Sequence, residues 1–232
     1  MKEDKSIDID DVAGLASGIH FVSGIDTDAG KTVCTGWLAR ELMHAGRTVA
    51  TMKLVQTGCG AFSPDIRVHR RIMGVHLAED DSLLTAPALF SYPASPHLAA
   101  EIDGARIDFK HLSECAETLA ARYDVVLVEG AGGLAVPLTR ELLSIDFVCQ
   151  QGWPLVFVTC GRLGAINHTL LSLEAVRNRE VLLSAVIFNR CNPVYDRVID
   201  EDTRHYVHDF CRKVHPETLW FECPILSQQE ML

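Results

Sequence analysis

HFVSGIDTDAGKT, at residues 20–32, is the stretch from which the fold of this chain can be predicted. An apolar run suited to a β-strand ends at Val22, a small polar turn follows, and Gly30-Lys31-Thr32 opens a helical pattern. This order is typical of a phosphate-binding loop, or P-loop. Loop amides and the helix N-terminus would face a phosphate group, while Lys31 would neutralise its charge and the Thr32 hydroxyl could ligate Mg²⁺.

The spacing of this loop departs from the usual pattern. Five residues separate Gly24 from Gly30, where the common P-loop has four, and Ile25 occupies the strict first-glycine position. A lysine is otherwise unfavourable at a helix N-terminus, so the place of Lys31 favours an anion nearby. The interpretation still needs support from the rest of the chain.

Composition limits the class of protein. The 232 residues fit one domain, 48% of them are hydrophobic, and no apolar run is long enough to cross a membrane, so we expect a soluble globular protein without a membrane partner. A net charge of −10 argues against nucleic acid as a partner. Eight cysteines without a Cys-x-x-Cys pair, and no secretory signal, predict reduced thiols and a cytoplasmic location.

Apolar runs and helical patterns alternate along the chain. We expect residues 1–17 to be a flexible acidic tail and residues 18–232 to form one α/β domain, a mostly parallel sheet with helices on both faces. Predicted strands are Ile19–Ser23, Thr48–Met52, Val125–Val128, Leu155–Thr159 and Val181–Phe188. Predicted helices are Lys31–His44, Ile66–Met73, Phe109–Arg122, Ile145–Gln150, Ala165–Asn178 and Val198–Lys213.

Ligands of such sheets bind beyond the carboxyl ends of the strands, where this chain carries polar and glycine-rich residues. Of its six lysines, only Lys31 and Lys53 lie at predicted strand ends, which suggests joint work on a phosphoryl group. Glu129 ends a central strand and could hold Mg²⁺, with a helix-capping or solvated acid as the alternative. Asp65 follows Pro64 at a helix start, where a capping role and a metal role are equally open.

Other motifs favour ordinary structural roles. His205, His208 and His215 with Cys211 lie at helical spacing, but a solvated helix face explains them better than a metal site. The Ser95-Pro96-His97 segment is typical of a turn, and no Ser-His-Asp arrangement is recognisable.

Taken together, these motifs resemble the dethiobiotin synthetases, whose P-loop also has five residues between its glycines. The resemblance covers about residues 19–226. It rests on Gly24–Thr32, Lys53 with Thr57-Gly58, Ser95-Pro96-His97, Val128–Gly133, Leu163–His168 and Asn189.

The resemblance implies an ATP- and Mg²⁺-dependent ligase. One amine of 7,8-diaminopelargonate would take up CO₂, supplied from bicarbonate, to give a carbamate. The carbamate would attack the γ-phosphate of ATP, and the second amine would then displace phosphate and close the ring. The products would be dethiobiotin, ADP and phosphate.

The resemblance implies a homodimer in which the Gly164–Asn167 segment of one chain contributes to the partner's site. It also implies four groups of site residues. Catalytic roles go to Lys31, Lys53 and Thr27. Nucleotide-binding roles go to Asp28, Ala29, Gly30, Lys31, Thr32, Glu129, Asn189 and Pro224. None goes to a threonine at position 33, since this chain has Val33 there. Substrate-binding roles go to Thr57, Gly132, Gly133, Gly164, Ile166 and Asn167, and metal-binding roles to Thr32, Asp65 and Glu129.

Three other functions fit parts of the pattern. An ATPase switch of the ParA/MinD kind would share the fold, but normally has an extra lysine at the loop start, where this chain has Ser23-Gly24-Ile25. An amide-forming ligase of corrin biosynthesis would need a glutaminase domain, for which 232 residues leave no room. A non-catalytic nucleotide-binding module would not need the set of charged site residues.

Overall fold

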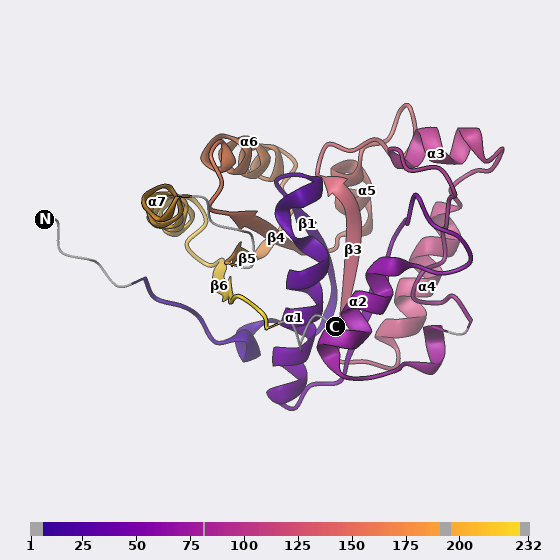
Figure 1. The fold of residues 1–232 in the computed structure, drawn as a ribbon, viewed down its shortest axis with the longest axis horizontal. Coiled ribbons are helices and arrows are strands. Elements are labelled where there is room, and N and C mark those ends of the chain that lie inside the picture. Colours follow the sequence, from indigo (N-terminus) through magenta and orange to yellow (C-terminus); the bar gives the residue numbers. More distant parts are fainter. Residues whose placement is uncertain (1–6, 81, 191–195, 228–232) are drawn as a thin grey trace, which may run out of the picture.

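A computed structural model of the chain describes residues 7–80, 82–190 and 196–227. Its centre is a six-stranded parallel sheet in the order β2-β3-β1-β4-β5-β6 (Figure 1). The strands are β1 (Gly18–Gly24), β2 (Val49–Lys53), β3 (Val125–Gly133), β4 (Leu155–Cys160), β5 (Leu183–Asn189) and β6 (Leu219–Cys223).

Seven α-helices in the described ranges connect or follow these strands. They are α1 (Lys31–His44), α2 (Pro64–Met73), α3 (Pro96–Ile102), α4 (Phe109–Ala120), α5 (Ser144–Gln151), α6 (Ala165–Asn178) and α7 (Arg197–Val214). Short 3₁₀ turns lie at η1 (Val12–Gly14), η2 (Thr27–Ala29) and η3 (Ala78–Asp80). Within the same ranges, no helix combines the length and the apolar character needed to cross a lipid bilayer.

The strand order sets the faces that the helices cover. The chain moves in one direction across the sheet from β1 to β2, and in the other from β3 through β4 and β5 to β6. Because such crossovers are right-handed, α1 lies on one face and α5, α6 and α7 lie on the other. The predicted parallel sheet with helices on both faces is therefore confirmed.

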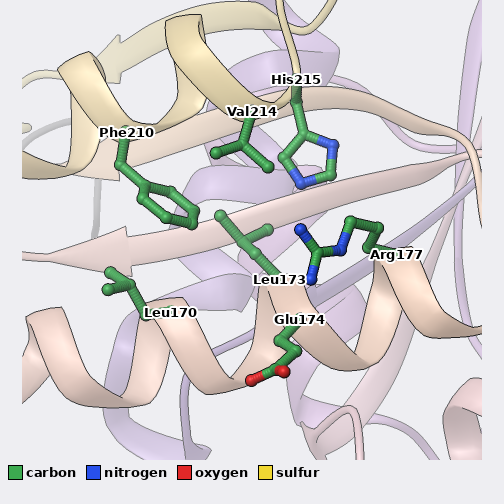
Figure 2. A pocket seen from close by; sticks show the side chains of 7 residues that line it. All are labelled: Leu170, Leu173, Glu174, Arg177, Phe210, Val214 and His215. Carbon is green, nitrogen blue, oxygen red and sulfur yellow. The ribbon is translucent and has the colours of Figure 1, made fainter.

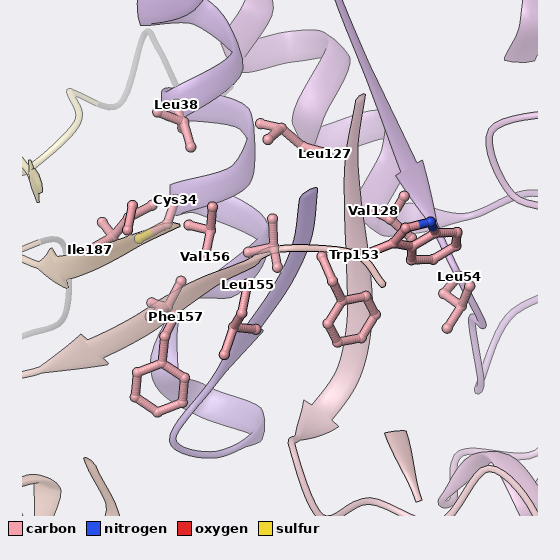
Figure 3. Packing of buried hydrophobic residues seen from close by; sticks show 14 of the residues in the cluster. Cys34, Leu38, Leu54, Leu127, Val128, Trp153, Leu155, Val156, Phe157 and Ile187 are labelled. Carbon is pink, nitrogen blue, oxygen red and sulfur yellow. The ribbon is translucent and has the colours of Figure 1, made fainter. Parts of the chain in front are cut away.

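The core is built from strand side chains that are buried on both faces. In Figure 3, Cys34 and Leu38 of α1 meet Val156 of β4 and Ile187 of β5, and all four are fully buried. Phe157, also fully buried, faces away from α1. Continuous apolar strands of this kind are the mark of a sheet that is covered on both sides.

The local sequence explains where α2 begins and ends. The Ser63 hydroxyl accepts the backbone N–H of Ile66, Pro64 occupies the first helical turn, and Gly74 ends the helix in the left-handed conformation. These signals fix where α2 begins and ends, which places Asp65 in its first turn and His69 one turn later.

Two elements were not predicted. The Ser95-Pro96-His97 segment, predicted as a turn, starts α3, because proline suits the first position of a helix. The strand β6 was missed because a five-residue apolar segment between a helix and a proline carries little periodic signal. The other strands and helices are confirmed with boundaries shifted by a few residues.

Part of the expected tail is attached to the domain. The Asp10 carboxylate accepts the backbone N–H of Trp220 at 2.7 Å and pairs with Arg212 at 2.8 Å, and Leu15 is buried. Asp10 therefore holds this segment to β6 and α7, and Arg47 donates to the backbone oxygen of Leu15, so the part of the tail around these residues is attached to the domain. Residues 1–6, also assigned to the tail, lie outside the described residues.

Candidate nucleotide and substrate site

The P-loop lies at the carboxyl end of β1 and turns directly into α1. The Asp26 carboxylate accepts the backbone N–H of Thr27 at 2.8 Å, and Thr27, Asp28 and Ala29 form the turn η2. Gly30 has φ +86°, a left-handed conformation that strongly favours glycine. Thr27 and Asp28 are exposed on the loop, whereas Ala29 is buried beneath it.

Lys31 folds back into the curve of this loop. Its Nζ donates to the backbone oxygen of Asp26 at 2.7 Å and, more weakly, to that of Thr27 at 3.4 Å. Burial lowers the pKa of Lys31 to about 8, and the charge of nearby Lys53 adds to this effect against the opposing charge of Glu129. The loop therefore already holds an ammonium group among its carbonyl oxygens.

Position 33, directly after the loop, has no part in the site. A threonine there would have added a second hydroxyl beside that of Thr32, but the residue is Val33, which has no polar side-chain atom. Val33 is partly buried and packs against the hydrophobic core. Position 33 therefore offers no hydroxyl to a nucleotide, as the sequence already indicated, and Thr32 supplies the hydroxyl next to Lys31.

Lys53 joins the two carboxylates that were predicted as metal ligands. Its Nζ lies 2.8 Å from Glu129 Oε1 and 2.6 Å from Asp65 Oδ2, and also donates to the backbone oxygen of Gly130 at 3.0 Å. Burial alone would lower the pKa of Lys53, but the two carboxylates raise it above its usual value. Asp65 does not cap α2, since Ser63 does, so the capping alternative is wrong.

Glu129 is the centre of the site. Only 1% of it is exposed, and burial alone would raise its pKa, but Lys53 and a hydrogen bond from His69 hold that pKa well below its usual range. The Thr32 hydroxyl donates to Glu129 Oε1 at 2.9 Å. A hydroxyl and two carboxylates thus converge near the P-loop.

These oxygens are donors of the kind that Mg²⁺ prefers. No group of three or more His, Cys, Asp or Glu side chains suited to a metal ion occurs in residues 7–80, 82–190 or 196–227. A metal ion at Thr32, Asp65 and Glu129 would therefore need further ligands, as Mg²⁺ commonly draws from water and substrate phosphates.

His69 is a site residue that the sequence analysis missed. It is completely buried, and its Nε2 lies 2.7 Å from Glu129 Oε2. It follows Asp65 by four residues, so both lie on the same side of α2. That spacing, next to a candidate metal ligand, is the signal that could have identified it.

Asn189 joins β5 to the P-loop. Its buried side chain donates Nδ2–H to the backbone oxygen of Ala29 at 2.9 Å, and a Cβ on Gly30 would collide with it. Cys223 of β6 pairs with Asn189 in the sheet, so Pro224, which is exposed, begins just beyond this position. Asn189 and Pro224, both predicted to bind the nucleotide, therefore lie at the same end of neighbouring strands.

A cavity of about 410 Å³ opens beside the loop. It brings together three predicted site residues, Thr27, Thr57 and Gly132. Its remaining lining is Pro93, Ala94, Ser95, Pro96, Ala131 and Val136. Gly133 packs next to it against the start of the loop, where a Cβ would lie 3.2 Å from the backbone oxygen of Gly24. The cavity is thus bounded by the P-loop, the end of β3 and the start of α3.

The start of α6 lies outside this cavity. Gly164 caps α6 with φ +88°, Ile166 is partly buried, and Asn167 is exposed, but none of the three lines the cavity of their own chain. The neighbouring Leu163 is 81% exposed. Arg162 reaches the P-loop, with its Nη2 3.1 Å from Asp26 Oδ2.

A second hollow, of about 260 Å³, lies between α6 and α7 and contains none of the predicted site residues (Figure 2). It is lined by Leu170, Leu173, Glu174, Arg177, Phe210, Val214 and His215. Of the nearby pattern of histidines and cysteine, Cys211 is buried, so the predicted solvated face is wrong at that position. Of the predicted site residues, Thr27, Thr57 and Gly132 line the first cavity, and none lines this second one.

Comparison with known proteins identifies the family. A protein family described as an AAA domain matches residues 20–220. The ATP-dependent dethiobiotin synthetase BioD 2 of Pasteurella multocida is 44% identical over 210 residues, which cover 90% of this chain and 98% of that protein. The ATP-dependent dethiobiotin synthetase BioD of Chlorobaculum tepidum is 49% identical over 178 residues, which cover 76% and 74% of the two chains.

Solved structures share the fold at low sequence identity. The MinC:MinD cell division protein complex of Aquifex aeolicus aligns with a TM-score of 0.53 at 14% identity, covering 91% of this chain and 83% of that one. A putative plasmid partition protein from Borrelia burgdorferi, bound to AMPPNP, aligns with a TM-score of 0.52 at 12% identity, covering 92% and 89%. These proteins show the P-loop fold alone, whereas the sequence relatives show the family: the chain belongs to the dethiobiotin synthetases.

Proposed function

We propose that this chain carboxylates 7,8-diaminopelargonate with CO₂ and closes the product to dethiobiotin, with ATP converted to ADP and phosphate. The observation that carries the proposal is that two buried lysines contact the rim of the cavity. Lys31 Nζ lies 3.4 Å from the backbone oxygen of Thr27, which lines the cavity, and Lys53 Nζ donates to Gly130, next to the lining residue Ala131. A switch ATPase needs no such cavity for a small substrate next to its phosphate loop.

The proposed reaction places negative charge against negative charge. One substrate amine attacks CO₂, forming an N–C bond and losing a proton to give the carbamate. A carbamate oxygen then bonds to the γ-phosphorus of ATP as the bond to ADP breaks. The second amine finally attacks the carbamoyl carbon, and phosphate leaves with the electrons of the broken C–O bond.

The roles proposed for individual residues follow from this charge problem. Lys31 and Lys53 reduce the repulsion between carbamate and triphosphate, and Thr27 offers a hydroxyl donor at the mouth of the cavity. Thr57, Gly132 and Gly133 bound the space for the reacting end of the substrate. Asp28, Ala29 and Gly30 supply the loop backbone, while Asn189 and Pro224 border the position for the base.

Mg²⁺ is part of this proposal. Thr32, Asp65 and Glu129 offer hard oxygen donors beside the P-loop, and these suit the ion. Bound Mg²⁺ would neutralise charge on the phosphate oxygens. A cytoplasmic location, by contrast, stays a prediction from composition alone.

The first test is turnover of the purified chain. ADP release is measured with MgATP in the presence and absence of 7,8-diaminopelargonate and bicarbonate, with dethiobiotin detected by mass spectrometry. We expect ADP release to require both reactants and to match dethiobiotin formation one to one. Hydrolysis that is indifferent to the diamine would refute the synthetase and favour the ATPase switch.

A matched pair of glycines tests the nucleotide loop. Gly30 and Gly46 have nearly the same φ, +86° and +85°, but a Cβ at Gly30 would collide with Asn189, whereas one at Gly46 meets nothing within 4 Å. Both Gly→Ala variants should lose about 1–2 kcal/mol of stability through the left-handed backbone. Only Gly30→Ala should also lose binding of a non-hydrolysable ATP analogue, measured by calorimetry. Equal affinities in the two variants would contradict the assignment.

The pKa of Lys31 predicts a proton change on nucleotide binding. In the free chain this pKa is lowered to about 8, so Lys31 gives up its proton as the pH rises through 8. A triphosphate favours the charged form, so binding above that pH should take up protons and should weaken as the pH rises. Calorimetry in two buffers of different ionisation enthalpy measures the uptake. Lys31→Arg should abolish it, and its absence in the wild-type protein would count against the placement of Lys31.

We further propose a homodimer in which the start of α6 from one chain completes the cavity of the other. The support is that Gly164 and Asn167 are exposed and lie outside their own chain's cavity. A helix N-terminus at that place suits the distal carboxylate of the substrate.

Subunit mixing tests this dimer. Lys31→Met disables the loop, and Asn167→Asp repels the carboxylate, so each variant alone should be inactive. In hybrid dimers one site would combine two intact halves, and an equal mixture refolded together should recover about a quarter of wild-type activity. Mixing without any recovery would show that each site is built within one chain.

A further inference from the structure

The His69 side chain is enclosed between two partners inside the domain. It is completely buried, with Nε2 2.7 Å from Glu129 Oε2 and Nδ1 3.0 Å from the Thr51 hydroxyl. Thr51 itself is fully buried within β2. Because both ring nitrogens have partners, the direction of the two hydrogen bonds decides which nitrogen carries the hydrogen.

That direction follows from Arg70, which can only donate. Its Nη1 donates to Thr51 Oγ1 at 2.7 Å, and its Nη2 donates to the Thr51 backbone oxygen at 3.1 Å. The Thr51 hydroxyl therefore accepts from Arg70. It keeps a second lone pair, but its buried hydrogen needs an acceptor, and among the described residues His69 Nδ1 is the partner that can accept it. Glu129, held as a carboxylate, can only accept, so the ring hydrogen lies on Nε2 and is donated to Oε2.

Arg70 is itself held on its far side. Its Nε and Nη2 donate to the two carboxylate oxygens of Asp80 at 2.8 and 2.9 Å, and Thr85 donates to Asp80 Oδ1 at 2.6 Å. A bidentate arginine–carboxylate pair fixes orientation as well as distance. Arg70, held in place by Asp80, thus starts a directed chain of hydrogen bonds that runs through Thr51 and His69 to Glu129.

These hydrogen bonds place the two carboxylate oxygens of Glu129 in different surroundings. Oε2 receives the His69 hydrogen at the rear, while Oε1 faces Thr32 and Lys53 beside the P-loop. We infer that His69 is a positioning residue, locked by Thr51 and Arg70 as the Nε2–H tautomer, which orients Glu129 so that Oε1 serves the metal and phosphates. The effect on turnover rests on the proposed function, whereas the tautomer does not.

The tautomer is tested directly by nitrogen NMR. Protein labelled with ¹⁵N-histidine contains ten histidines, and the His69 signal is identified by its loss in His69→Gln. We expect a hydrogen on Nε2 and none on Nδ1 in the chain without nucleotide. A hydrogen on Nδ1, or a doubly protonated ring, would overturn the inference. Thr51→Val removes the hydroxyl at nearly constant shape and should shift the Nδ1 signal by taking away its hydrogen bond, whereas Thr51→Ser should keep the wild-type signal.

Variants at position 69 separate positioning from packing. The amide of His69→Gln can still donate near the Nε2 position, whereas His69→Phe keeps the ring volume and donates nothing. We expect His69→Phe to lower kcat about 10–100-fold and to raise the Mg²⁺ concentration needed for binding of a non-hydrolysable ATP analogue. KM for the diamine should change little, and His69→Gln should stay close to wild type. His44→Gln, at an exposed histidine, is the control.

The outcomes are distinct from those that test the proposed function. If folded His69→Phe and His69→Gln lose kcat to the same extent, His69 acts only by packing, and the inference is overturned. If His69→Phe does not fold, Thr51→Val decides, since it leaves Glu129 and the P-loop untouched. In that variant, normal kcat and normal Mg²⁺ dependence would also overturn the inference. The NMR and nucleotide-binding measurements need no diamine, so they remain informative if synthetase turnover is absent.

Discussion

The ion pair between Lys53 and Glu129 is the interaction on which the site depends. Both groups are almost completely buried, and either charge alone would be costly in the interior. The opposite charges of the two groups compensate each other, with Lys53 Nζ 2.8 Å from Glu129 Oε1, and each group contacts further residues. Asp65 and His69 come from α2, and Thr32 comes from the start of α1. Loss of the pair would therefore disturb four elements at once.

The strand order makes this ion pair possible. β3 lies between β1 and β2 although it follows both in the chain, and Lys53 and Glu129 are directly paired in the sheet register. Val22, near the end of β1, pairs with Glu129 from the other side, so the P-loop starts beside the same carboxylate. Parallel strands bring their carboxyl ends to one edge, and that edge is where ligands of such sheets bind.

Proteins with other names share this fold. The structural neighbours include MinD and plasmid partition proteins at 12–14% identity, which shows how little of the sequence the fold requires. In this chain the site combines a cavity beside the loop with two buried lysines, Lys31 and Lys53. Function therefore has to be argued from these side chains, since the fold alone is compatible with several activities.

The sequence by itself determined the α/β class, the P-loop and the residues that follow each strand, because hydrophobic period and loop chemistry are local properties of the chain. It also singled out Lys53 and Glu129, since each lies at the end of an apolar run. Only the tertiary structure decided that Asp65 pairs with Lys53 instead of capping α2, that Asn189 holds the loop backbone, and that Asp10 is bound to β6 and α7. The role of His69 was hidden for the same reason. Its partners Thr51 and Glu129 lie 18 and 60 residues away, and contacts between distant segments leave no period in a sequence.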